Sequence, residues 1–370
     1  MRNEHERLGA TMERLGPVEA PLHYGDPVAE HLAVRNHAGV ADLSHRGLWR
    51  LSGPDAERFL QGILTNDIAS LRQGQGCYAL SLTGRGKIVS EVIVLRRSSD
   101  FLMHAPAETR EAGFASLDRY LVGDDAALTN EGEALGMLGL FGPAAPLVAA
   151  GVLGGAVAEL PDHHFVERPF AGATVLLAGA SWTGEKGFEI IAPAATLPGL
   201  WGSLLERIAA EGGRAVGGAA LDTLRIEAGY PRGGVDFGED TLPQTAGLEK
   251  ALDHKKGCYR GQEIVLRVHT KGQVKHLLMG LLLDDGGAVL PPHGTKLERN
   301  GTEIGWITSA ALSPTLKRPL ALGYLDRDAR APGTRVEVKT TPAGAATVAE
   351  LPFYGAGVAS AGGGASGGLT

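Results

Sequence analysis

The stretch from Gly280 onward constrains the fold most, because it breaks into short apolar segments separated by turn signals. The turns are marked by Pro291-Pro292-His293-Gly294, Arg299-Asn300-Gly301 and Ala331-Pro332-Gly333. Short strands at regular spacing with such turns predict an all-β module that closes into a small barrel or sandwich. We expect this module to end near Tyr354. Residues 355–370 contain seven glycines and show no periodicity, so a flexible tail is expected there.

The chain before this module has a different pattern, in which helical and extended segments alternate. Residues 28–38 and 55–64 have helical spacing, and the first of these segments is stopped by Gly39. Residues 88–95 carry apolar side chains on both faces of an expected strand, which predicts a strand covered on both sides. Because 370 residues exceed what one compact core normally supports, we expect two or three domains packed together.

Composition excludes several classes of protein. The net charge of −7 argues against broad nucleic-acid binding, which needs a cationic face. No run of about 18 apolar residues occurs, so no membrane-spanning helix is expected. Met1–Gly16 lacks the apolar core of a secretion signal. Cys77 and Cys258 are too few for a disulfide framework, and they predict a reducing, cytoplasmic setting.

The segment from Lys256 to Glu263 combines a thiol, cations and two glycines. Cys258 has three cationic residues within three positions, and cationic neighbours favour the reactive thiolate form. The alternative is that Cys258 is a small buried apolar residue, as free cysteines often are. The surrounding residues 250–275 hold seven Lys or Arg against two acidic residues, which indicates either a solvated face or a surface that attracts an anionic ligand. The nearby histidines and the one cysteine fit no closed zinc pattern, so no metal is expected.

Three further residues have chemistry that packing alone does not require. Glu91 falls in the middle of the apolar segment 88–95 and needs either a partner or a ligand, unless the strand bends and solvates it. Glu189 follows a glycine-flanked turn into an apolar strand. Arg225 lies on a helical stripe and is suited to a carboxylate or a heteroaromatic edge, although most such arginines are structural.

Several segments of the chain are similar to segments of one protein superfamily and occur in the same order. They are Glu30-His31-Leu32-Ala33-Val34-Arg35, Ala38-Gly39-Val40-Ala41-Asp42-Leu43-Ser44-His45, Gly53-Pro54-Asp55-Ala56, Phe59-Leu60-Gln61, Leu64-Thr65-Asn66-Asp67, Leu224-Arg225-Ile226-Glu227-Ala228-Gly229 and Leu351-Pro352-Phe353-Tyr354. With them, the span from about Tyr24 to Tyr354 resembles the YgfZ/GcvT superfamily of folate-binding proteins. This superfamily includes the aminomethyltransferase, or T-protein, of the glycine cleavage system.

Two motifs place the chain within that superfamily. Lys256-Gly257-Cys258-Tyr259-Arg260-Gly261-Gln262-Glu263 resembles the K-G-C-Y-x-G-Q-E motif of the YgfZ branch, which supports assembly or repair of iron-sulfur enzymes. T-proteins lack that motif and carry an Asp-Asp pair where this chain has Ser90-Glu91. A longer Glu displaces the carboxylate, and a displacement of about 1 Å can cost ~100-fold in rate, which argues against aminomethyl transfer. In contrast, Gly187-Phe188-Glu189-Ile190 and Arg225 resemble T-protein elements that hold the pterin.

The resemblance implies an α+β fold with three domains arranged as a cloverleaf around a folate channel, with a C-terminal antiparallel β-barrel. The implied domains are residues 1–50 plus 135–245, an inserted lobe 51–134, and 246–354, followed by the tail 355–370. The implied cofactor is tetrahydrofolate or a derivative. The expected partners are reduced folate and iron-sulfur client enzymes or assembly proteins.

The resemblance also implies roles for particular residues. Cys258, at the channel mouth, and Glu91 are the candidate catalytic residues. The candidate folate ligands are Glu189, Arg225, Lys256 and Tyr259, and the basic residues 250–275 are expected to attract the glutamate tail of the folate. The leading hypothesis is a folate-binding accessory factor for iron-sulfur enzymes. The alternatives are an aminomethyltransferase of the glycine cleavage type and a folate-sensing module without chemistry.

Overall fold

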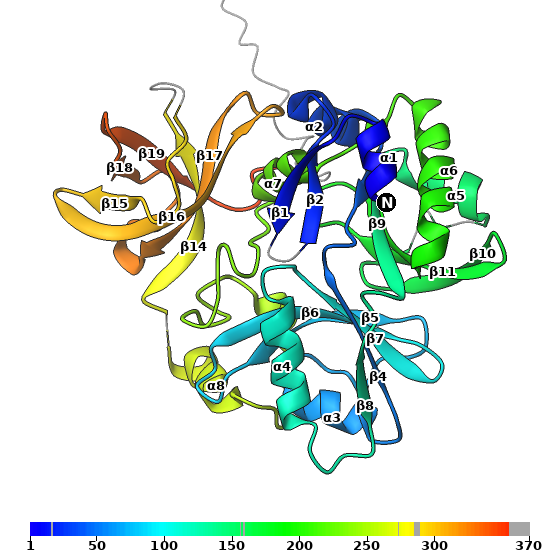
Figure 1. Ribbon diagram of the computed structural model, residues 1–370. Helices are drawn as coiled ribbons and strands as arrows, with labels where there is room; N and C mark the ends of the chain where they lie inside the picture. Colours follow the sequence, from blue (N-terminus) through cyan, green and yellow to red (C-terminus); the bar gives the residue numbers. More distant parts are fainter. Residues whose placement is uncertain (16–17, 156, 158–159, 273, 285–288, 355–370) are drawn as a thin grey trace, which may run out of the picture.

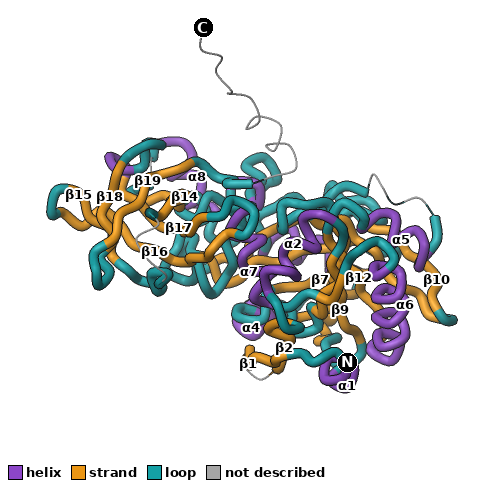
Figure 2. The backbone as a smooth tube through the Cα atoms, turned by 90° about the horizontal axis from the view of Figure 1, so that it is seen from above, coloured by secondary structure: helices purple, strands orange, loops and turns teal. Residues whose placement is uncertain are grey.

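The structure of the chain is a computed structural model that describes residues 1–370 except 16–17, 156, 158–159, 273, 285–288 and 355–370. The predicted flexible tail, 355–370, therefore lies outside the described residues. The described part forms three lobes, with a β-barrel on one side of two sheet-containing lobes (Figure 1). Seen from above, the barrel and the helices α5 and α6 lie at opposite ends of the molecule (Figure 2).

The first lobe is built on a six-stranded sheet with the strand order β10-β11-β12-β9-β3-β13. Its elements are β3 (Gly39–Asp42), β9 (Leu135–Phe141), α5 (Ala145–Leu153), β10 (Phe165–Phe170), β11 (Ala173–Ala180), β12 (Gly187–Pro193), η1 (Ala194–Thr196), α6 (Leu197–Ala209), β13 (Arg214–Ala215) and α7 (Gly218–Glu227). Neighbouring strands are antiparallel except the pair β3 and β13. One face of the sheet packs on α5 and α6 through a core that includes Phe188, Leu200 and Trp201, all buried.

The N-terminal elements add to this lobe. They are α1 (Arg2–Arg7), the hairpin of β1 (Thr11–Leu15) and β2 (Val18–His23), and α2 (Pro27–Asn36). The Asp26 side chain accepts hydrogen bonds from the backbone N–H groups of Val28 and Ala29, which caps α2, and Pro27 occupies its first turn. The helix predicted for residues 28–38 is therefore confirmed within two residues.

The second lobe is a five-stranded antiparallel sheet with the order β5-β6-β7-β4-β8. Its elements are β4 (Gly47–Ser52), α3 (Ala56–Ile63), β5 (Gly76–Leu82), β6 (Ile88–Arg96), β7 (Asp100–Ala105), α4 (Arg110–Tyr120) and β8 (Ala127–Asn130). Phe59, Leu60 and Ile63 form the buried face of α3, as their helical spacing predicts. Strand β6 is buried on both faces from Ser90 to Leu95, so the prediction of a doubly covered strand is confirmed.

The faces of the two sheets that are turned towards each other share one hydrophobic core. Leu48 and Ile93 contribute to it from the second lobe, and Met137, Phe141 and Leu176 contribute from the first. Side chains that lie between two such sheets are shielded from water. A polar group placed there needs a partner or a ligand.

The third lobe is a closed antiparallel barrel with the order β14-β17-β16-β15-β18-β19. Its elements are η2 (Glu249–Ala251), α8 (Gln262–Lys271), β14 (His276–Leu283), β15 (Lys296–Arg299), β16 (Thr302–Ser313), β17 (Arg318–Asp326), η3 (Arg327–Ala329), β18 (Arg335–Val338) and β19 (Gly344–Ala349), with η2 and α8 preceding the barrel strands. The predicted α+β fold with a C-terminal antiparallel barrel is confirmed. The domain boundaries drawn from the sequence stay a prediction.

None of the described helices is both long and apolar enough to cross a membrane.

Candidate active site

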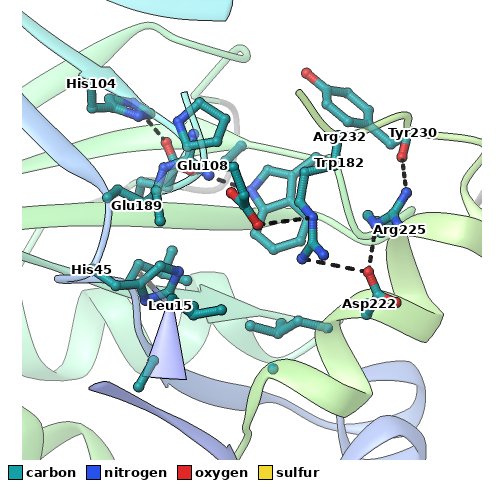
Figure 3. Close-up of a pocket in the computed structure, with 18 of the residues that line it drawn as sticks. Leu15, His45, His104, Glu108, Trp182, Glu189, Asp222, Arg225, Tyr230 and Arg232 are labelled. Atoms are coloured by element: carbon teal, nitrogen blue, oxygen red, sulfur yellow. Dashed lines mark hydrogen bonds and ion pairs between the residues drawn. The ribbon is translucent and has the colours of Figure 1, made fainter. Parts of the chain in front are cut away.

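A cavity of about 1070 Å³, counting the part open to solvent, lies where the two sheets, the β1–β2 hairpin and helix α7 meet. Three of the residues singled out in the sequence line it: Glu91, Glu189 and Arg225. Most of its other charged or aromatic side chains come from segments far apart in the sequence, as Figure 3 shows for His104, Trp182 and Arg232. A concave site of this size with convergent polar groups is the usual form of a small-molecule site.

Glu91 is buried on β6, and each of its carboxyl oxygens has one hydrogen-bond partner. The Tyr78 hydroxyl donates to Oε2 over 2.8 Å, and the backbone N–H of Gly233 donates to Oε1 over 2.8 Å. A Cβ atom at Gly233 would lie 3.0 Å from Oε1, so the glycine permits this close approach. Burial raises the pKa of Glu91 despite these two donors, which makes the group suited to holding a proton.

Glu189, on β12, is also buried but has the opposite electrostatic environment. His104 Nε2 lies 3.1 Å from Oε2, and the Trp182 indole donates to Oε1 over 3.2 Å. Burial alone would raise the pKa of Glu189, but the interactions with His104, and the charge of Arg46, outweigh burial and lower it to about 2. Burial in turn lowers the pKa of His104. The cavity therefore holds one carboxyl group whose pKa is raised by burial and one whose pKa is lowered by its neighbours, which is a typical arrangement for acid–base chemistry.

Several buried nitrogen atoms that face this region have no hydrogen-bond partner. They are His45 Nδ1, His104 Nδ1, His163 Nδ1 and Arg46 Nε, all from residues that line the cavity. Burial, followed by the charge of Arg46, lowers the pKa of His45 to about 4. Buried polar atoms are rarely left unpaired in folded proteins, so these atoms indicate that a polar ligand completes the site.

Arg225 lines the cavity, but its guanidinium is largely occupied by the protein. It donates to Asp222 (2.7 Å), Asp236 (2.6 Å), Ser309 Oγ (2.8 Å) and the carbonyl of Tyr230 (3.1 Å). These contacts tie helix α7 to barrel strand β16. At most one of its five N–H donors is left for a ligand, so the observed contacts give Arg225 a positioning role, and its contact with the pterin stays a prediction.

The segment Lys256–Glu263 lies outside the cavity, since none of its residues is among those that line it. Lys256 Nζ donates to the carbonyls of Leu64 (2.6 Å) and Asn66 (2.5 Å), and burial lowers its pKa to about 8. Arg260 donates to the carbonyl of Leu82 and lies 4.2 Å from the centre of the Tyr120 ring. These contacts make the segment a clamp on the second lobe.

Gly261 and Tyr259, in the same segment, also pack against neighbouring parts of the protein. Gly261 has φ +82°, and a Cβ there would lie 2.5 Å from the carbonyl of Thr83, at the turn before β6. The Tyr259 side chain is part of the core between the sheets. The placement corrects the expectation that Lys256 and Tyr259 hold the ligand and that Cys258 lies at the channel mouth. Cys258 is exposed, which rules out the alternative of a small buried apolar residue, but it is not among the residues that line the cavity.

The remaining basic residues of 250–275 do not line the cavity either, as far as the structure describes that range. The cations that do line it are Arg46, Arg225 and Arg232. Arg232 faces the carboxylates of Glu108 and Asp222, at 3.4 and 3.5 Å (Figure 3). Sequence reasoning missed Arg46, Tyr78 and His104. The signal that could have indicated one of them is His104, an imidazole in the apolar run of β7.

Comparison with known proteins assigns the chain to a family. Residues 1–256 match the model of the GCVT N-terminal domain, and residues 277–355 match that of the glycine cleavage T-protein C-terminal barrel domain. The chain belongs to the glycine cleavage T-protein family. Within this T-protein family, an aminomethyltransferase of Rubrobacter xylanophilus is 35% identical over 352 residues, covering 95% of this chain and 92% of that protein. One of Pelodictyon phaeoclathratiforme is 35% identical over 339 residues, covering 90% and 92%.

A solved structure agrees with these relatives. The glycine cleavage system aminomethyltransferase T from Bartonella henselae superimposes on this T-protein family member with a TM-score of 0.86 and 31% identity, covering 95% of this chain and 96% of that one. The expectation of an iron-sulfur accessory factor of the YgfZ type is therefore wrong, because the relatives that match nearly the whole chain are named aminomethyltransferase. The expected iron-sulfur partners were implied by the YgfZ resemblance alone, so they are no longer supported. The motif Lys256–Glu263, on which that expectation rested, contacts the second lobe and contributes no residue to the cavity lining.

Proposed function

We propose that this chain is an aminomethyltransferase that moves the one-carbon unit of a lipoyl-bound aminomethyl group to tetrahydrofolate and releases ammonia. The observation that carries the proposal is the pair of buried carboxyl groups, Glu91 and Glu189, in one cavity with pKa values shifted in opposite directions. Family membership supports the reaction class, since the relatives cover nearly the whole chain.

The residues of the cavity fit a reduced folate. An ionised Glu189 accepts hydrogen bonds from N–H groups at the edge of a flat pterin, and the unpaired nitrogens of His45, His163 and Arg46 are available to its other polar atoms. The predicted cofactor, tetrahydrofolate, is confirmed at the level of the family. When bound, it supplies the nitrogen atoms that take up the one-carbon unit.

The protein's own groups then have distinct tasks. Glu91 is placed to hold and release a proton at its carboxyl oxygens, because burial raises its pKa above the ordinary value of 4.5. Tyr78 and the backbone of Gly233 fix the position of that carboxyl group. Trp182 and His104 hold the Glu189 side chain in one orientation, so that it is ready to bind before the ligand arrives.

The proposal is tested by incubating the protein with tetrahydrofolate and a lipoyl carrier loaded with the aminomethyl group. The expected result is catalytic release of ammonia with formation of methylene-tetrahydrofolate. Saturable binding of reduced folate without turnover would instead favour the folate-binding module, and it would overturn the transferase. Absence of both binding and turnover would overturn the site as well.

Replacing Glu189 by Ala is expected to raise the Kd for tetrahydrofolate by about 10- to 100-fold, the size expected for loss of charge-assisted hydrogen bonds. The measurement is calorimetric titration with reduced folate. The Kd of Glu189→Gln, which keeps the shape of the side chain but not its charge, should lie between those of the parent protein and Glu189→Ala. An unchanged Kd in both variants would remove Glu189 from the site.

Replacing Cys258 by Ala is expected to leave the Kd for tetrahydrofolate and the rate of aminomethyl transfer unchanged within about twofold. The reason is that the thiol is exposed and lies outside the cavity lining. The same two assays check this, and the variant also serves as the matched control for Glu189→Ala. A loss of transfer of tenfold or more would return Cys258 to the mechanism.

A further inference from the structure

Three side chains with metal-binding atoms meet on the surface between the second lobe and the barrel, outside the cavity. Glu249 lies on η2, His254 on the loop after it, and His269 on α8. Their ligating atoms all lie within 4.8 Å of one another, and this is the only such group of His, Cys, Asp or Glu found in the part of the chain that the structure describes. His276, which the sequence places near these histidines, instead lies 2.9 Å from Asp326.

The arrangement leaves hydrogen-bonding capacity unused. The two imidazole rings are stacked with centroids 3.8 Å apart and planes inclined by 21°. His254 Nδ1 is buried without a partner, and His254 Nε2 is 3.5 Å from Glu249 Oε2, too long for a strong hydrogen bond. A buried polar atom without a partner is costly in the absence of a ligand.

We propose that Glu249, His254 and His269 bind one zinc ion. Two imidazoles and one carboxylate form a donor set that suits zinc, whereas calcium and magnesium prefer oxygen ligands alone. Bonds of about 2.0–2.2 Å to one ion need only a small movement of the ligating atoms, which lie within 4.8 Å of one another. Glu249 and His269 are exposed, so their side chains are free to rotate towards the ion. Water occupies the fourth position.

The ion has a structural consequence that is separate from the proposed transfer reaction. His254 and His269 flank the segment Lys256–Glu263, which clamps the second lobe. Lys256 donates to the carbonyl of Leu64, Arg260 donates to that of Leu82, and Gly261 packs against Thr83. A metal that joins the two histidines closes this loop and reduces the freedom of the unfolded chain. The zinc site therefore stabilises the clamp, and it needs no contact with folate.

The test uses the full chain, stripped with a chelator and dialysed. Zinc affinity is measured by competition with a chromophoric chelator, and Co²⁺ serves as a spectroscopic probe of the ligands. One ion per chain is expected, with a visible Co²⁺ absorption band typical of four-coordinate sites. His269→Ala and Glu249→Gln should each weaken zinc binding by at least ~10-fold and remove or shift the band. His276→Asn is the matched control and should change neither.

The variants should fold like the parent protein, because they replace exposed side chains. The Kd for reduced folate, which should equal that of the parent protein, checks this. No zinc binding by the parent protein would overturn the proposal. Binding that is equally strong in His269→Ala, Glu249→Gln and the parent would also overturn it, because the ion would then be held adventitiously by other surface groups. If the parent protein bound zinc but did not catalyse aminomethyl transfer, the result would count against the proposed function and leave the metal site standing.

Discussion

Replacing Glu91 by Gln lowers the turnover number for aminomethyl transfer by about 100- to 10,000-fold, the range by which positioned acid–base groups accelerate proton transfers. The amide cannot act as a proton donor or acceptor in the way a carboxyl group can, and burial raises the pKa of the Glu91 carboxyl. The substitution keeps the side chain's shape, and the amide oxygen can still accept from the Gly233 N–H. Initial rates of ammonia release at saturating tetrahydrofolate measure the effect.

The controls for this substitution separate chemistry from binding. The Kd for tetrahydrofolate should change little in Glu91→Gln. Tyr78→Phe, which removes one donor to the same carboxyl group, should give a smaller loss of turnover. A turnover number for Glu91→Gln within threefold of the parent value would show that the proton is moved by another group. A turnover number for Glu91→Asp above that of the parent protein would indicate that the longer Glu side chain at this position lowers the rate.

Replacing Glu227 by Gln lowers the free energy of unfolding at pH 7 by about 3–5 kcal/mol, the range observed when one partner of a buried ion pair is removed. Glu227 is fully buried at the end of α7. Its Oε2 accepts from Arg35 Nη2 over 2.7 Å and from Thr315 over 3.0 Å, and Ser313 donates to Oε1. The carboxylate thus connects α2, α7 and the barrel. Urea denaturation measures the loss, and Glu239→Gln, at an exposed glutamate, should cost less than about 0.5 kcal/mol.

The pH dependence of this loss has a definite sign. Burial alone would raise the pKa of Glu227, but hydrogen bonds and charge from His31, with those from Ser313 and Arg35, lower it from 4.5 to about 2. A depressed folded-state pKa contributes stability that is fully present above pH 4.5 and is lost as the pH falls towards 2. The difference in unfolding free energy between the parent and Glu227→Gln should therefore shrink between pH 5 and pH 3. A penalty under about 1 kcal/mol at pH 7, or one that does not shrink in acid, would contradict this account.

Local patterns were sufficient for most of the architecture. Turn residues after Gly280 predicted an all-β module, either a barrel or a sandwich, and the structure shows the barrel. The spacing of Phe59, Leu60 and Ile63 predicted the buried face of α3. The same approach found Glu91 and Glu189, because a carboxylate in an apolar strand is unusual wherever that strand packs. Such signals depend only on neighbouring residues, and tertiary packing did not reverse them here.

The segment Lys256–Glu263 shows where sequence reasoning failed. Its thiol, cations and glycines resemble a reactive loop, yet the same residue types also build a clamp, with Lys256 and Arg260 donating to backbone carbonyls of the second lobe. Residue type sets what a side chain can bind, whereas the position of its partners decides what it does bind. Arg225 followed the same rule, since Asp236 and Ser309 occupy most of its donors.

The sequence by itself determined the C-terminal β-module and the two unusual carboxylates, because these depend on periodicity and on the cost of burying a charge. The fold class and the closed barrel came from the family resemblance. Only the tertiary structure decided which groups share a site. It brought His104 and Trp182 to Glu189, Tyr78 to Glu91, and Glu249 to the stacked histidines. A contact such as that between His104 and Glu189, which are 85 positions apart, is set by how the sheets and lobes pack, and no local pattern in the chain records that packing.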